Sequence, residues 1–218
     1  MLSVISSHAL YGISGCIVQV EVDIRFGLPG IDIVGLPDSA VREARERVRV
    51  AIRNSGFEFP AQRILVSLAP AGIKKGGSAF DLPIALGILA ASGQIAFPKS
   101  EKILVLGELN LSGKVGPARG VLTAVEAGLR DQHEVFLVPL ENLPEARILC
   151  RGKIFAVTDL GQAAVLVSSG FTAGICDAHA PAAIAPLSLN AAKGGSLDNQ
   201  EVSASFYNIY SGDFSDIK

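Results

Sequence analysis

The glycine-rich loop from Lys74 to Ser78 is the first of three groups of residues that could do chemistry in this 218-residue chain. Its glycines would let backbone amides converge, and two lysines and the start of a helix would add positive charge, so the loop could hold an anion such as phosphate. The loop is not a Walker A sequence, because G-x-x-x-x-G-K-[S/T] occurs nowhere in the chain. We favour the alternative, an ordinary flexible connection, since short glycine-rich loops are common.

Ser78 is the second candidate, as a nucleophile that would need a base to take its proton. The segment 76–80 lacks the final glycine of the G-x-S-x-G elbow, which argues against an α/β-hydrolase. A Ser-Lys dyad stays open, with Lys74, Lys75 or Lys114 as the source of the amine. Such a dyad requires an amine within about 3 Å of the hydroxyl, which sequence proximity alone does not establish.

The third candidate is a row of arginines on a predicted helix. Four of them fall at positions i, i+3, i+7 and i+11: Arg42, Arg45, Arg49 and Arg53. Such a row could meet the phosphates of DNA or the acidic surface of a partner, whereas Arg47 lies off it. Glu43 and Glu46 could instead pair with neighbouring arginines and leave a self-compensated helix face. We favour the compensated face, because no aromatic residue interleaves with the arginines.

Histidine and cysteine positions argue against metal and disulfide chemistry. The three histidines have no second ligand three to five residues away, and the three cysteines are far apart, which fits free thiols in a reducing compartment. The longest apolar stretch, 82–91, is far shorter than the roughly 20 residues that span a bilayer. We expect a cytoplasmic protein with no metal site and no membrane contact.

Composition excludes wholesale disorder, because 49% of the residues are hydrophobic and 18% are charged. The net charge of -2 argues against a highly basic nucleic-acid coat protein. The balance is uneven along the chain, however. Residues 38–119 hold twelve Lys or Arg against seven Asp or Glu, a local excess of +5.

Hydrophobic patterning predicts the elements that must position these residues. Strict alternation over 18–26 predicts a half-buried strand, and 31–34 resumes after Gly27–Gly30, which predicts an antiparallel hairpin. Asp38 is a predicted N-cap for a helix that runs to about Ser55, and Asp81 for a second helix through Ser92.

The second half of the chain alternates predicted strands with predicted helices. Strands are expected at 64–68, 103–106, 135–138 and 154–157, a helix at 121–130, and short helices after the last two strands. This pattern predicts an α/β (α+β) domain over 1–170, with a mixed sheet covered by helices. Residues 171–210 are rich in Ala, Pro and Ser and are expected to be a partly disordered linker.

Several segments together resemble the N-terminal domain of the ComM/YifB family, the magnesium-chelatase-like AAA+ ATPases. The resemblance covers roughly residues 1–170 in order and rests on Gly27-Leu28-Pro29-Gly30, Val34-Gly35-Leu36-Pro37-Asp38, the Arg-rich run 41–54, Leu68-Ala69-Pro70-Ala71, and 77–85. It implies a ribosomal protein S5 domain 2-like fold, shared with the proteolytic domain of Lon.

The resemblance to Lon also assigns two positions. Ser78 stands where Lon carries its catalytic serine, and Leu122 stands where Lon carries its catalytic lysine. A leucine cannot accept a proton, so peptidase chemistry is lost unless another lysine replaces that amine in space. The resemblance therefore implies a Lon-like fold with no catalytic residues; the alternative is a Ser78-dependent Lon-like peptidase.

The resemblance implies a function for a longer protein. Residues 211–218 look like the lead-in to an AAA+ module that the chain does not include. The complete protein would then bind ATP and Mg, form a hexameric ring and act on DNA as a branch-migration helicase in natural transformation. We expect this chain to be its non-catalytic accessory domain, with no cofactor of its own. Its partners would be its own AAA+ module, ring neighbours and DNA, the last through Arg42, Arg45, Arg49, Arg53, Lys74 and Lys75.

Overall fold

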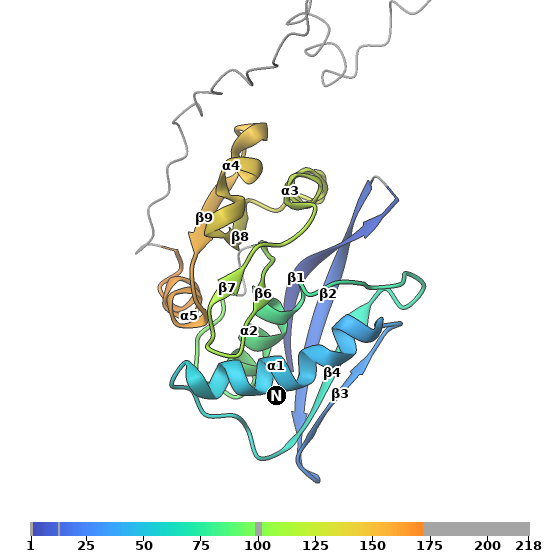
Figure 1. Ribbon diagram of the computed structural model, residues 1–218, viewed down its shortest axis with the longest axis vertical. Coiled ribbons are helices and arrows are strands. Elements are labelled where there is room, and N and C mark those ends of the chain that lie inside the picture. Colours follow the sequence, from blue (N-terminus) through green and yellow to red (C-terminus); the bar gives the residue numbers. More distant parts are fainter. Residues whose placement is uncertain (1, 13, 99–101, 172–218) are drawn as a thin grey trace, which may run out of the picture. The chain divides into compact units, whose positions relative to one another are not determined.

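The computed structural model describes residues 2–12, 14–98 and 102–171 (Figure 1). In spatial order its main sheet consists of β3 (Gly30–Val34), β4 (Arg63–Ala69), β2 (Ser14–Arg25), β1 (Leu2–Tyr11), β5 (Ile103–Val105), β8 (Val135–Pro139) and β9 (Lys153–Val157). A second, two-stranded sheet pairs β6 (Glu108–Leu109) with β7 (Val115–Gly116). The linker and the AAA+ lead-in expected from the sequence lie outside the described residues.

Five α-helices accompany the sheets in the described residues: α1 (Ser39–Asn54), α2 (Asp81–Ala91), α3 (Val121–Arg130), α4 (Leu143–Ala146) and α5 (Leu160–Ser168). Short 3₁₀ turns at Leu140–Asn142 and Arg147–Leu149 flank α4. The predicted mixed sheet covered by helices is confirmed. The ribosomal protein S5 domain 2-like assignment stays a prediction.

Helix α1 follows the sequence prediction at both ends. The Asp38 carboxylate accepts a hydrogen bond from the Val41 amide at 2.9 Å, which satisfies one of the amides left free at a helix start. The helix ends at Asn54, and Gly56 follows with a φ of +84°. Apolar residues at helical spacing are buried along one face of α1: Val41, Ala44, Val48 and Ile52.

The predicted hairpin between 18–26 and 31–34 is wrong, because β4 lies between β2 and β3. It runs antiparallel to β2 and parallel to β3. Three alternating residues of β4 are fully buried: Ile64, Val66 and Leu68. This continuous apolar face suits a strand that has a neighbour on each side. Phe26, which the alternation places in the strand, lies beyond it and is 95% exposed.

Strands β5 and β8 are buried on both faces of the sheet. In β5 and β8, Val105 and Leu137 pack into the core beneath α1, α2 and α5, whereas Leu104 and Phe136 pack into a second core with residues of α3 and α4. Adjacent strand residues point to opposite faces, so continuous apolar runs supply both cores. The strands predicted at 103–106 and 135–138 correspond to β5 and β8.

Asp81 does not cap α2, contrary to the sequence prediction. Phe80 is the N-cap residue, and Asp81 is the first helical residue, with a side chain that is fully buried. Arg47 of α1 donates two hydrogen bonds to its carboxylate, from Nε at 2.9 Å and from Nη2 at 3.1 Å. Burial raises the pKa of Asp81, and the Arg47 guanidinium opposes that shift. This bidentate ion pair joins α1 to α2.

Replacing Arg47 should destabilise the domain strongly. In Arg47→Ala the Asp81 carboxylate would remain buried without its cation, so we expect a loss of about 3 kcal/mol in the free energy of unfolding. Urea denaturation followed by circular dichroism measures this loss. Arg45→Ala, an exposed change on the same helix, should stay within about 0.5 kcal/mol of the wild type. Equal losses in the two variants would contradict the role assigned to the ion pair.

His8 on β1 makes stability depend on pH. Its side chain is buried, 3.4 Å from the Thr123 hydroxyl, and burial lowers the pKa of His8 to about 4. The unfolded chain binds a proton near pH 6.5 and the folded chain does so near 4, so stability falls as the pH drops through this window. We expect His8 to contribute a loss of about 2 kcal/mol between pH 7.5 and 5.

Urea unfolding of wild type and His8→Gln at both pH values tests this expectation. The variant should lose clearly less stability on acidification. Some loss should remain, because burial lowers the pKa of His133 as well. A pH dependence identical in both proteins would show that His8 is not the source.

Candidate functional site

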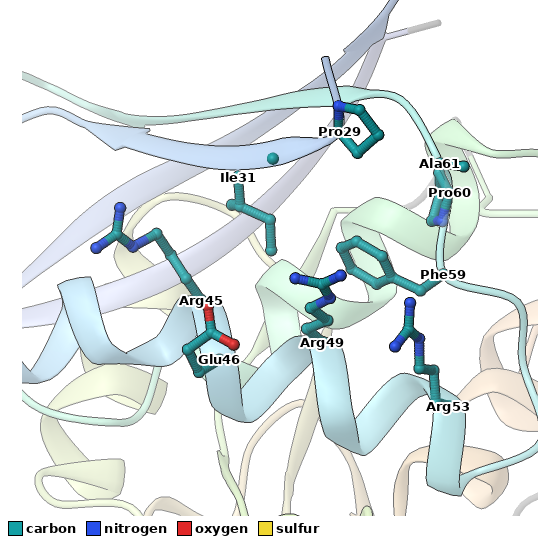
Figure 2. Close-up of a pocket in the computed structure, with 10 residues that line it drawn as sticks. Pro29, Ile31, Arg45, Glu46, Arg49, Arg53, Phe59, Pro60 and Ala61 are labelled. Atoms are coloured by element: carbon teal, nitrogen blue, oxygen red, sulfur yellow. The ribbon is translucent and has the colours of Figure 1, made fainter.

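Three of the four predicted arginines line one cavity of about 390 Å³ (Figure 2). Arg45, Arg49 and Arg53 come from the exposed side of α1. The opposite wall is formed by Pro29, Gly30 and Ile31 at the start of β3, and the third side by residues 59–61. Arg42 belongs to the same row, and its carbonyl accepts a hydrogen bond from Arg45 Nε at 3.0 Å.

Phe59 lies beside two of these guanidinium groups. The Cζ atoms of Arg49 and Arg53 are 5.6 Å and 5.8 Å from the centre of its ring, within cation-π range. Figure 2 shows the three side chains close together. Phe59 lies outside α1, so an aromatic residue sought along the helix itself does not include it. The chain reverses after Gly56 and returns Phe59 to the arginine face, a contact that helical spacing does not reveal.

Of the carboxylate–arginine pairs that we favoured from the sequence, the described residues contain one, between Glu43 and Arg47. Glu43 contacts Arg47 at 3.9 Å rather than an arginine of the row. Within 2–12, 14–98 and 102–171, none of the four arginines of the row forms an ion pair. Glu46 lines the cavity without reaching salt-bridge distance to any of them. The row therefore presents arginines without ion-pair partners beside an aromatic ring, with Glu46 as the one carboxylate in the same lining.

Ser78 lies in a separate cavity of about 640 Å³, between the β1–β2 turn and the loop before α2. Its hydroxyl donates a hydrogen bond to the Glu108 carboxylate, and Lys74, His8 and Arg119 line the same cavity. Glu108 was not singled out from the sequence, since an isolated glutamate after a short strand carries no distinctive signal. A carboxylate is a weaker base than an amine, so this pair is a poor substitute for a Ser-Lys dyad.

The three lysines considered as partners of Ser78 lie in three different environments. Lys74 is exposed and lines the Ser78 cavity. The side chain of Lys75 is fully buried and donates a hydrogen bond to the Pro70 carbonyl, and burial lowers the pKa of Lys75. Lys114 lines another cavity, beside Thr158 and Asp159. In the described part of the chain, no lysine amine hydrogen-bonds Ser78.

Leu122 lies in the first turn of α3, where its amide donates to Glu145 at 2.9 Å. The residues of that segment that line the Ser78 cavity are instead Pro117, Ala118 and Arg119. The described residues thus provide a serine with a carboxylate partner and no lysine amine hydrogen-bonded to it.

The glycine-rich loop is held by Asp38 rather than left open for an anion. The Gly77 amide donates to the Asp38 carboxylate at 3.2 Å, and the Asp38 amide donates to the Lys75 carbonyl at 2.9 Å. One of the amides that could have received a phosphate oxygen therefore already has an internal carboxylate partner. This contact argues against an anion site in the loop, whereas the flexible connection that we favoured from the sequence stays a prediction.

The described residues contain neither a metal-binding cluster nor a helix able to span a membrane. No group of three or more His, Cys, Asp and Glu side chains there could hold a metal ion. None of the helices described has both the length and the apolar character that crossing a membrane requires.

Comparison with known proteins places the chain among larger relatives. It is 44% identical over 156 residues to an uncharacterized protein of Mycobacterium tuberculosis, covering 72% of this chain and 31% of that protein. It is 40% identical over 148 residues to the competence protein ComM of Haemophilus influenzae and 39% identical over 148 residues to the uncharacterized protein YifB of Escherichia coli. Each of these two alignments covers 68% of this chain and 29% of the relative.

A more distant similarity joins the chain to Lon. The Lon protease of Trichlorobacter lovleyi is 22% identical over 158 residues, which cover 66% of this chain and 19% of that protein. The alignments with the Mycobacterium tuberculosis, YifB and ComM proteins cover less than a third of the length of each relative. The family model described as subunit ChlI of Mg-chelatase matches residues 20–142, more than half of the 218-residue chain. The chain therefore belongs to the ComM/YifB family, with a ChlI-like N-terminal region that is distantly similar to Lon.

Proposed function

We propose that this chain is the non-catalytic N-terminal accessory domain of a ComM-like AAA+ ATPase that acts on DNA. The longer protein would be an ATP-dependent DNA helicase that binds ATP and Mg, assembles as a hexamer and takes part in branch migration and recombination during natural transformation. Two findings support the proposal: membership of the ComM/YifB family, and a relative named as a competence protein. In this proposal the domain docks on its own ring and contacts DNA.

The arginine row is the observation that carries the DNA contact. Charge that is already neutralised by neighbouring carboxylates has little to offer a phosphate, whereas the four arginines of the row form no ion pair within the described residues. Lys74 is exposed and stays in the proposed contact surface. Lys75 is withdrawn from it, because its side chain is fully buried.

Removing the arginine row should weaken DNA binding and its dependence on salt. We expect the triple variant Arg45→Ala/Arg49→Ala/Arg53→Ala to bind DNA at least about tenfold more weakly at low salt, because about three phosphate contacts are lost. The slope of log affinity against log salt should become shallower by about 3. Fluorescence anisotropy with a labelled oligonucleotide over a salt series measures both quantities.

A matched variant removes three cations outside α1: Arg130→Ala/Arg151→Ala/Lys153→Ala. Its residues belong to the end of α3, the segment before β9 and the start of β9, and we expect it to keep wild-type affinity and slope. If both triple variants lost the same DNA affinity, the loss would come from overall charge. That result would contradict a specific DNA-binding surface on α1. If the wild type did not bind DNA at low salt, the DNA contact would be refuted, and only docking on the AAA+ ring would remain of the proposed role.

The alternative function, a Ser78-dependent peptidase, has a direct test. Because the Ser78 hydroxyl donates to a carboxylate and no lysine amine contacts it in the described residues, we expect no labelling by a fluorophosphonate probe. Wild type and Ser78→Ala should give the same blank result, with a known serine hydrolase as the positive control. Labelling of the wild type that disappears in Ser78→Ala would restore the peptidase.

A further inference from the structure

The cavity lined by Arg45, Arg49, Arg53 and Phe59, hereafter the arginine cavity, has the size of a small-ligand site. Its volume of about 390 Å³ lies at the lower end of the range typical of ligand pockets, roughly 300–1,000 Å³. A cavity of this size can take one ring with an attached charged group. A double helix is too wide to enter a cavity of this volume.

The lining of the arginine cavity combines positive charge with flat apolar surface. Three arginines against the single carboxylate of Glu46 give the lining a net charge of +2. Phe59, Pro29 and Pro60 contribute their rings to the rest of the lining (Figure 2). A ligand that complements both features carries a planar ring and an anionic group in one unit.

Contacts with Phe59 hold two of the guanidinium groups over the cavity. Arg49 and Arg53 pack at 5.6 Å and 5.8 Å from the ring centre, which restricts their rotamers before a ligand arrives. Guanidinium groups offer fork-shaped donors to phosphate and planar faces on which bases can stack. The Phe59 side chain is only half buried, so part of it remains available at the cavity.

We propose that the arginine cavity binds one nucleotide unit of single-stranded DNA, with the phosphate on the arginines and the base against Phe59 and its guanidinium neighbours. This inference rests on the proposed function and specifies which form of DNA the domain recognises. A base in a duplex is already paired and stacked, so it would have to leave the double helix to reach Phe59. Single strands therefore bind more tightly than duplexes of the same sequence.

The test compares a labelled oligothymidine of about 15 nucleotides with its duplex, by fluorescence anisotropy at one low salt concentration. Phe59→Leu keeps an apolar side chain against the core and removes the ring. We expect it to lose at least about fivefold in affinity for the single strand, the lower end of what one base-aromatic stack contributes. Its affinity for the duplex should fall clearly less, because a duplex loses only the restriction of Arg49 and Arg53 and no base contact. Phe59→Tyr, which keeps the ring, should bind the single strand like the wild type.

Tyr11→Leu is the matched control, because Tyr11 is an exposed aromatic residue that lines the Ser78 cavity instead. It should leave both affinities unchanged. Single-strand binding by Phe59→Leu at the wild-type level, or an equal loss for single strand and duplex, would overturn the inference. Thermal unfolding of each variant confirms that the comparison is made between folded proteins.

Two further outcomes separate this inference from the proposed function. Binding of both DNA forms that depends on the arginines but not on Phe59 would refute the base contact and leave the proposed DNA contact standing. Absence of binding to either form by the wild type would refute both. Thymidine monophosphate should compete only at concentrations far above those of the oligonucleotide, and competition at equal concentrations would assign the cavity to a free nucleotide instead of a strand.

Discussion

The buried ion pair between Arg47 and Asp81 sets the orientation of α1, and the rest of the arginine surface depends on that orientation. Arg47 lies roughly 200° around the helix from Arg45 and Arg49. Fixing Arg47 toward α2 therefore turns the arginine row away from the core and toward β3. The five arginines of α1 thus do two different jobs: one neutralises a buried carboxylate, and four remain available to solvent or to a ligand.

Local signals in the sequence were sufficient for α1 and α3. The capping carboxylate of Asp38 and the apolar spacing set the bounds of α1, and the predicted helix at 121–130 coincides with α3. Strand β1 was missed, because Ser6, Ser7 and His8 interrupt its apolar pattern although Ser7 and His8 are buried. Its place depends on pairing with β2 along its whole length, which is a tertiary property.

The site could be predicted only in part, for physical reasons that differ from residue to residue. Helical spacing found the arginine row, but their lack of carboxylate partners depends on Glu43 turning to Arg47. Phe59 reaches the row through a reversal of the chain, and Glu108 reaches Ser78 across separate elements. Lys75 is the opposite case, since a lysine in a glycine-rich loop is expected in solvent and is here buried against a carbonyl. Contacts of this kind are set by the packing of distant segments, which periodicity does not encode.

The arginine cavity has walls of unequal stiffness. One wall is α1, held through its buried face and the Arg47–Asp81 pair, and the other begins at β3, the strand at the rim of the described sheet, with β4 as its neighbour. A rim strand can bend outward while the central ladder stays intact, whereas a shift of α1 would disturb the core. If the entrance of the arginine cavity widened for a larger ligand, the movement would therefore come from β3. The spacing between the guanidinium groups on α1 would stay the same.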